Sequence, residues 1–260
     1  MNKTTLLLIA VLCFSGFVGK SQDSVATKKS PFSLNADVMS RYIWRGVNLG
    51  GNTPSIQPTL KHNFGNTKHA FSLGAWGAYS VGGNQFQECD LTFSYTFKEM
   101  FTLGFTDYFF PADDGTSVKY GNYKDKETGH LYEGTLTFNG TDKIPFTLMY
   151  AMNVYGCDAR KINADGTDGG IFMSKYVELG YKKNFDDMAL TVFVGGTLDN
   201  PNRDRGEIGF YGNRSNGIIN VGCKLSKDIK ITDKFSLPIQ TQLIVNPEQE
   251  RIYMVFGLSL

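Results

Sequence analysis

The stretch ECDLTFSYTF, residues 88–97, alternates between two kinds of side chain. Its odd positions from Leu91 to Phe97 are apolar or aromatic, whereas its even positions from Glu88 to Thr96 are acidic or carry a hydroxyl group. Successive side chains of a β-strand point to opposite faces of the sheet. The stretch therefore predicts a strand with one apolar and one polar face.

The same alternation recurs from residue 33 to residue 260, and no stretch with helical periodicity separates the segments. Many segments have the roughly 9–11 residues that a tilted strand needs to cross a membrane. We expect twelve strands, with ten or fourteen as alternatives. The predicted strands are 33–46, 54–65, 69–82, 87–97, 100–110, 130–139, 145–156, 173–183, 188–198, 216–226, 235–246 and 250–260.

The connectors between these segments alternate in length, and the longest are Pro111–Gly129, Gly156–Phe172 and Asp199–Ser215. Short turns on one side and long loops on the other are typical of barrels in the outer membrane of double-membraned bacteria, where the long loops lie outside the cell. The alternative is an exported β-sandwich, whose inner face is usually filled by Val, Ile and Leu. The aromatic residues near strand ends instead favour an all-β, up-and-down antiparallel transmembrane barrel.

The first residues have the features of a secretory signal peptide. Lys3 is followed by the apolar run Leu6–Phe17 and by small residues at 19–21. That run is shorter than the roughly 20 residues of a membrane-spanning helix. We therefore expect a signal peptide at 1–21, a short periplasmic leader at 22–31 and the barrel at 32–260.

Four quoted stretches resemble a known bacterial family. DVMSRYIWRGVNLGGNTPSIQPTL at 37–60, FSLGAWGAYS at 71–80, ECDLTFSYTF at 88–97 and FTLGFTDYFFP at 101–111 are similar, in this order, to the TorF-type porins, earlier carried as a conserved domain of unknown function. The resemblance is specific over 37–111. It implies an outer-membrane barrel with a pore, and it brings no known substrate.

The polar face of each strand is predicted to line the lumen. On this parity Trp44 faces lipid, and Arg41 and Arg45 form either an anion-attracting rung or ion pairs with Asp37, Glu88 or Asp90. Trp76 is expected to fill or to narrow the lumen. The predicted lumen-facing residues are Asp37, Arg41, Arg45, Gln57, Lys61, Trp76, Glu88, Asp90, Glu178, Lys182 and Lys224. No catalytic residue, metal site or cofactor is predicted.

The sequence favours passive passage of small solutes through the lumen. One alternative is a non-conducting barrel that acts through its long external loops. Another is an outer-membrane hydrolase, although none of the three histidines, His62, His69 and His130, stands in a recognisable Ser-His-Asn arrangement.

The expected partners follow from the barrel and from the charge. They are outer-membrane lipid, small solutes and the insertion machinery, which would read the alternating final strand Arg251–Leu260. The net charge of +1 offers no electrostatic basis for binding nucleic acid.

Overall fold

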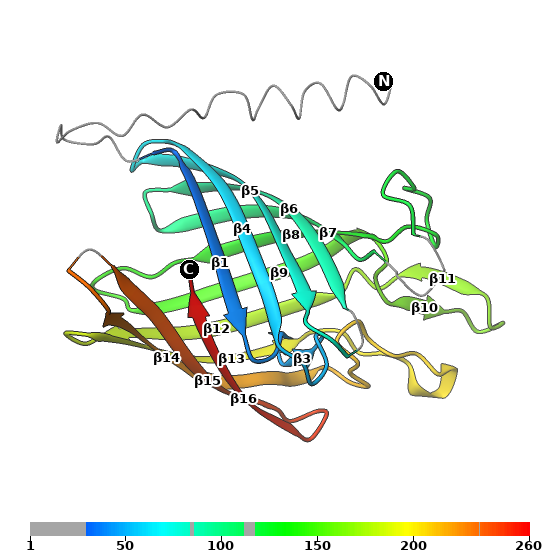
Figure 1. Cartoon of the computed structure of the whole chain (residues 1–260). Helices are drawn as coiled ribbons and strands as arrows, with labels where there is room; N and C mark the ends of the chain where they lie inside the picture. Colours follow the sequence, from blue (N-terminus) through cyan, green and yellow to red (C-terminus); the bar gives the residue numbers. More distant parts are fainter. Residues whose placement is uncertain (1–29, 84–85, 112–117, 234) are drawn as a thin grey trace. The chain divides into compact units, whose positions relative to one another are not determined.

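The computed structural model describes residues 30–83, 86–111, 118–233 and 235–260. The predicted signal peptide and nearly all of the predicted leader lie outside the described residues, as do residues 112–117 of the longest predicted loop. The part from Pro31 onward is a closed antiparallel barrel of twelve strands (Figure 1). The predicted fold class and strand number are therefore confirmed.

Each strand pairs with its neighbours in the barrel, and β1 pairs with both β4 and β16, which closes the sheet. Two small hairpins, β2–β3 and β10–β11, and the 3₁₀ turn η1 lie in the connections. No helix in the described ranges is long and apolar enough to span a membrane. The elements are β1 (Phe32–Met39), β2 (Ile43–Trp44), β3 (Val47–Asn48), β4 (Ser55–Gly65), β5 (His69–Ser80), β6 (Gln87–Phe97), β7 (Phe101–Phe109), β8 (His130–Phe138), β9 (Phe146–Gly156), β10 (Arg160–Ile162), β11 (Asp168–Ile171), β12 (Lys175–Asn184), β13 (Met188–Thr197), η1 (Arg203–Arg205), β14 (Gly217–Lys230), β15 (Ser236–Asn246) and β16 (Arg251–Ser259).

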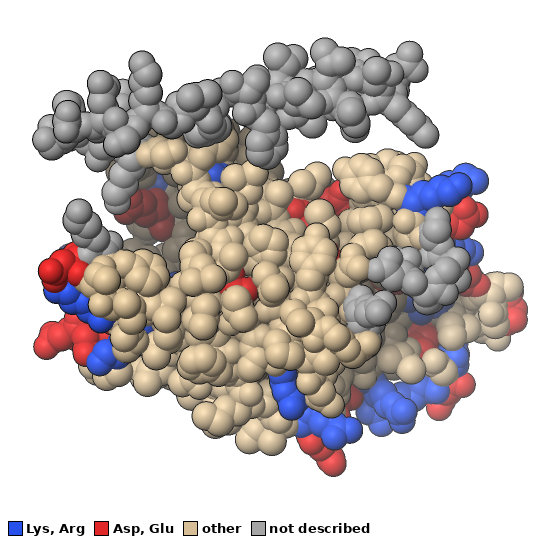
Figure 2. Space-filling view, viewed as in Figure 1, with Lys and Arg blue, Asp and Glu red and all other residues tan. Residues whose placement is uncertain are grey.

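The two faces of the strands separate as the period of two requires. On β6, Leu91 and Phe93 are exposed on the outside, whereas Glu88 and Asp90 are buried inside. Figure 2 shows uncharged atoms over most of the middle of the viewed face, with charged residues gathered toward its ends. A closed barrel satisfies every strand hydrogen bond without water, so an apolar exterior can contact lipid. The protein is a barrel of the bacterial outer membrane.

The two ends of the barrel differ in the length of their connections. The start of β1, the end of β16 and the turns 66–68, 98–100, 139–145, 185–187 and 231–235 share one end. In the turn between β6 and β7, Lys98 and Glu99 both have positive φ, and Met100 N–H donates to the carbonyl oxygen of Phe97. This backbone matches the twist of the flanking strands and makes a tight hairpin. The loops 40–54, 157–174 and 198–216 and the segment 118–129 lie at the opposite end.

The first predicted strand is wrong in its second half. The barrel strand ends at Met39, and the chain then turns into the hairpin β2–β3 rather than continuing to residue 46. Arg45 and Gly46 have φ values of 49° and 80°, which a strand does not adopt. The structure differs from the prediction in two further places. The strand β14 continues to Lys230, beyond its predicted end at residue 226, and the connection after β9 contains the hairpin β10–β11.

The facing of β6 can be tested by placing an arginine on either side of the barrel wall. We expect Phe93→Arg to destabilise the folded barrel by roughly 2–4 kcal/mol, because an arginine near the bilayer midplane is costly. Thr92→Arg should cost less, since its side chain enters the wet lumen. Denaturant titration of both variants in lipid vesicles checks this, and equal costs would refute the facing.

The orientation of the barrel can be tested by labelling single cysteines on intact cells in a background with Cys157→Ser. Ala164→Cys, in the loop between β10 and β11, should react with an impermeant maleimide. Lys143→Cys, in a short turn, should react only after the outer membrane is permeabilised. The reverse pattern would place the long loops in the periplasm.

Candidate functional site: a hairpin across the lumen

Residues 40–50, here called the lumen hairpin, contact strands from around the whole barrel. Ser40 N–H donates to the carbonyl oxygen of Phe256 on β16, at 2.7 Å. The Asn246 side chain on β15 donates to the Gly46 carbonyl oxygen, at 3.1 Å. On the other side, the ring of Tyr42 lies 5.4 Å from that of Trp76 on β5. These strands flank β1 on both sides in the closed barrel, so the lumen hairpin turns inward from the end of β1.

Arg45 at the tip of the lumen hairpin is the buried centre of these contacts. Its two terminal nitrogens both donate to the carboxylate of Glu133 on β8, with Nη2 to Oε1 at 2.9 Å. Its Nη1 also donates to the Tyr211 hydroxyl, at 2.9 Å. The guanidinium lies 4.5 Å from the ring centre of Trp44 and 4.7 Å from that of Tyr176. The pair is bidentate and sandwiched between aromatic rings, an arrangement that compensates for the loss of water around both charges.

A second layer of hydrogen bonds holds the partners of Arg45. The Tyr108 hydroxyl donates to Glu133 Oε1, at 3.0 Å. The Tyr176 hydroxyl and the Asn220 amide both donate to Glu178, at 2.6 and 3.0 Å. These residues come from β7, β8, β12 and β14. The network therefore links the lumen hairpin to a broad arc of the barrel wall.

Trp44 does not face lipid, contrary to its predicted place on the outer surface, and Tyr42 of the same hairpin also lies inside the barrel. Trp44 stacks on Tyr211 at 5.6 Å and meets the edges of Tyr108 and Phe210, and Tyr42 is buried. The turn after Met39 carries both rings into the lumen. Gly46 makes this possible, because a side chain there would collide with the Ile219 carbonyl oxygen on β14.

The predicted partners of Arg45 are also wrong. It pairs with Glu133, not with Asp37, Glu88 or Asp90. Glu133 stands at an inward position of β8, and that parity is the signal by which the sequence could have revealed it. Tyr211 lies in the loop 198–216, where no periodicity marks it.

The predicted lumen residues line three separate cavities, a recess at the short-turn end and one buried position. Glu88 is buried. A cavity of about 460 Å³ is lined by Lys61, Trp76 and Asp90, together with the hairpin residues Tyr42 and Trp44. The others are placed as follows: Asp37, Arg41, Gln57 and Lys224 line a cavity of about 230 Å³, Arg45 and Glu178 line one of about 240 Å³, and Lys182 lines the recess.

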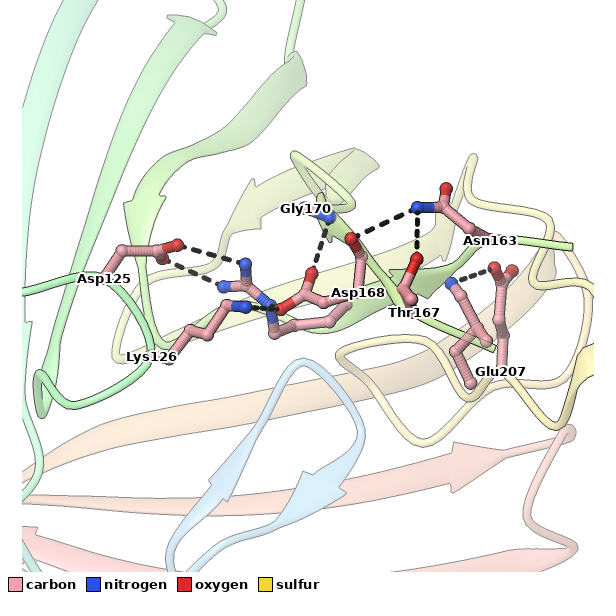
Figure 3. Close-up of polar contacts among 9 residues, drawn as sticks. Asp125, Lys126, Asn163, Thr167, Asp168, Gly170 and Glu207 are labelled. Carbon is pink, nitrogen blue, oxygen red and sulfur yellow. Dashed lines mark hydrogen bonds and ion pairs between the residues drawn. The ribbon is translucent and has the colours of Figure 1, made fainter. Parts of the chain in front are cut away.

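The long loops form an ion-pair network of their own, drawn in Figure 3. Arg160 donates to both oxygens of Asp125, at 2.9 and 3.1 Å, and to Asp168, at 2.7 Å. Lys126 pairs with Asp168 at 2.6 Å. Hydrogen bonds from Lys126, Arg160 and the Gly170 N–H hold the pKa of Asp168 well below its usual range. The network ties the segment 118–129 to β10 and β11.

Glu207 extends the loop contacts to a third loop. Its carboxylate accepts from the N–H groups of Ile162 and Asn202, both at 2.7 Å, and these bonds hold its pKa below the usual range. The loops 118–129, 157–174 and 198–216 are therefore joined to one another.

His130 anchors the first of these loops to the outside of the barrel. Its Nδ1 lies 2.7 Å from Asp107, and its Nε2 lies 2.8 Å from the Tyr120 carbonyl oxygen. The imidazole is fully buried and stacks on Tyr123. Both ring nitrogens are engaged, so neither is free to act as a general base.

A family model matches residues 25–200, which is most of the chain. The family is described as a bacterial protein of unknown function, Gcw_chp. The protein belongs to the Gcw_chp family. No curated protein matches the sequence at a significant level.

Solved structures of outer-membrane barrels resemble the chain weakly. The NanC porin is 8% identical, with a TM-score of 0.42, and the match covers 87% of this chain and 98% of that one. The COG4313 outer membrane channel from Pseudomonas putida F1 is 13% identical, also with a TM-score of 0.42, and the match covers 93% and 98%. BamA from Haemophilus ducreyi is 15% identical, with a TM-score of 0.37, and the match covers 93% of this chain and 49% of that one.

The loop network predicts how the Gcw_chp barrel resists proteases. Replacing Arg160 by Met removes the hydrogen bonds to Asp125 and Asp168, so the loops should open more often and be cut faster by proteinase K on intact cells. Arg214→Met is the matched control, because the Arg214 side chain forms no hydrogen bond or ion pair with any described residue. Equal cleavage of both variants would show that the network does not hold the loops.

Proposed function

We propose that this Gcw_chp barrel is a channel for small solutes whose outer half is held narrow by the lumen hairpin. The observation that carries the proposal is the bidentate pair between Arg45 and Glu133, which fastens the hairpin across the interior. Barrels of about eight strands are filled by side chains, and those of sixteen or more leave an aqueous channel. A twelve-stranded barrel with an internal hairpin falls between these limits.

Several inward residues of the wall toward the short-turn end are small, which supports an open path for solutes in that half of the barrel. In three strand pairs an inward glycine lies directly opposite an inward threonine. The pairs are Gly74 with Thr92, Gly104 with Thr135, and Gly180 with Thr147. A Cβ on each glycine would lie close to the threonine hydroxyl, so the two residues are matched in size. Small polar side chains at this level leave room for water and solutes.

The loop network favours a second function, that of a non-conducting barrel acting through its external loops. Three loops joined by Arg160, Asp168 and Glu207 present an ordered surface, which a partner can bind at low entropic cost. This function requires no open lumen. Conductance separates it from the first.

Single-channel recording of the refolded protein in planar bilayers tests the channel. Wild type should show small conductance steps. Arg45→Met removes the ion-pair partner of Glu133. The buried carboxylate is then left without a compensating positive charge, which favours an arrangement in which water reaches it. We therefore expect larger steps from Arg45→Met, and larger steps again when residues 41–50 are replaced by a short Gly-Ser linker.

The control for these recordings is Lys227→Met, which removes an exposed ion pair with Asp187 at the short-turn end. It should leave the steps unchanged. Heat-modifiable mobility on gels shows whether each variant is folded. If folded wild type and the folded linker variant both show no steps, the lumen is sealed and the non-conducting function is favoured.

A further inference from the structure

We infer that the 460 Å³ cavity beside the lumen hairpin binds a small solute that carries an ammonium group, and that it prefers solutes that also carry a carboxylate. The inference rests on the proposed function for the route by which such a solute enters. The cavity is lined by an acidic residue, Asp90, a basic residue, Lys61, and aromatic walls from Trp44, Trp76 and Tyr108.

The acidic side of the cavity has an oxygen without a partner. Asp90 is only 5% exposed, and its Oδ1 accepts no hydrogen bond from any described residue. Asp90 and Glu88 are two positions apart on the inward face of β6, and Glu88 Oε2 also lacks a hydrogen-bond partner among the described residues. Two carboxyl groups this close repel each other when both are ionised, and a bound cation would relieve that repulsion. A buried carboxylate oxygen without a donor is costly, and an N–H group of a ligand would satisfy it.

The aromatic walls suit a cation. The rings of Tyr42 and Trp76 lie 5.4 Å apart, and those of Trp44 and Tyr108 lie 5.8 Å apart. Ring faces attract ammonium and guanidinium groups, most strongly where water is excluded. The same lumen already uses this chemistry, since the Arg45 guanidinium lies over Trp44.

The basic side of the cavity is set apart from the acidic side. Lys61 pairs across the sheet with Gly74, and Gly74 pairs with Thr92 next to Asp90 on the inward face of β6. The Lys61 stem passes beside Gly74, where an added Cβ would lie in ordinary contact with Lys61 Cγ, at 3.5 Å, but only 2.5 Å from the Thr92 hydroxyl oxygen. No ion pair joins Lys61 to Asp90 among the described residues. A solute with an ammonium at one end and a carboxylate at the other would meet both charges.

An organic cation fits the residues better than a metal ion does. Within the described ranges, no three His, Cys, Asp or Glu side chains are grouped so that they could hold a metal. The volume of about 460 Å³ is within the range of pockets that take small organic molecules.

Tryptophan fluorescence gives a direct test, because the chain has two tryptophans and both line this cavity. The refolded full chain in detergent would be titrated with butylamine, 4-aminobutyrate, butyrate and glucose. We expect saturable changes with butylamine and 4-aminobutyrate, tighter binding of 4-aminobutyrate, and none with butyrate or glucose. Saturable binding of glucose without binding of either amine would overturn the inference, as would no response to any probe.

Two variants test which residue binds the ammonium end of the solute and which binds its carboxylate end. Asp90→Asn keeps the size of the side chain and should weaken binding of both amines by about tenfold or more, since a charged hydrogen bond is lost. Lys61→Met should remove the preference for 4-aminobutyrate while butylamine still binds. Asp142→Asn, at an exposed acid in the turn 139–145 that lines only the recess at the short-turn end, should change neither affinity. Unchanged amine binding by folded Asp90→Asn would overturn the assignment.

This test is independent of conductance. If amines bind but no variant conducts, the channel function fails and the binding site stands. If the barrel conducts but no amine alters the fluorescence, the binding site fails and the channel function stands.

Discussion

The constraint on which the structure depends is that a backbone in lipid must bond all of its own polar groups. In a sheet this is possible only when the first and last strands pair. Asp37, Val38 and Met39 on β1 meet Ser259, Leu258 and Gly257 on β16, and Ala36 and Leu260 exchange two backbone hydrogen bonds. Closure then fixes a lumen, and the period of two assigns every strand residue to the lumen or to lipid.

A twelve-stranded barrel lies between barrels of about eight strands, which side chains fill, and those of sixteen or more, which leave an aqueous channel. The lumen hairpin occupies part of that interior and brings Arg45 to Glu133 in the presence of Tyr211 and Tyr176. A buried ion pair is weak evidence for stability in itself, but breaking it costs about 3–5 kcal/mol. Release of the hairpin from the lumen would break this pair, so the ion pair favours the bound position.

The cavity and the hairpin are physically linked, because Tyr42 and Trp44 belong to the hairpin while Trp76 and Asp90 belong to the wall. A solute held between them would contact both. By linkage, such a solute stabilises the state in which the hairpin is bound, in proportion to its difference in affinity for the two states. Solute binding and the width of the lumen would then be two aspects of one equilibrium.

The sequence by itself determined the twelve barrel strands, apart from the end of the first, and the facing of strands such as 88–97, since both follow from local alternation. The segment 88–97 has its apolar side outward and its acidic side inward, as its pattern requires. The same logic placed Asp90, Lys61 and Trp76 on the inner wall, where all three line one cavity. The placement of these three residues could be predicted from the alternation along each strand and from the order of neighbouring strands.

Only the tertiary structure decided the lumen hairpin. Residues 41–45 keep the alternation of the preceding strand, so periodicity could not show that the strand ends at Met39. The deciding features are the positive φ of Arg45 and Gly46 and the close approach of Gly46 to Ile219. Glu133 and Tyr211 lie 88 and 166 residues from Arg45 in the chain, and closure of the barrel is what brings them to it. A pattern read along the chain carries no information about which charges meet across a lumen.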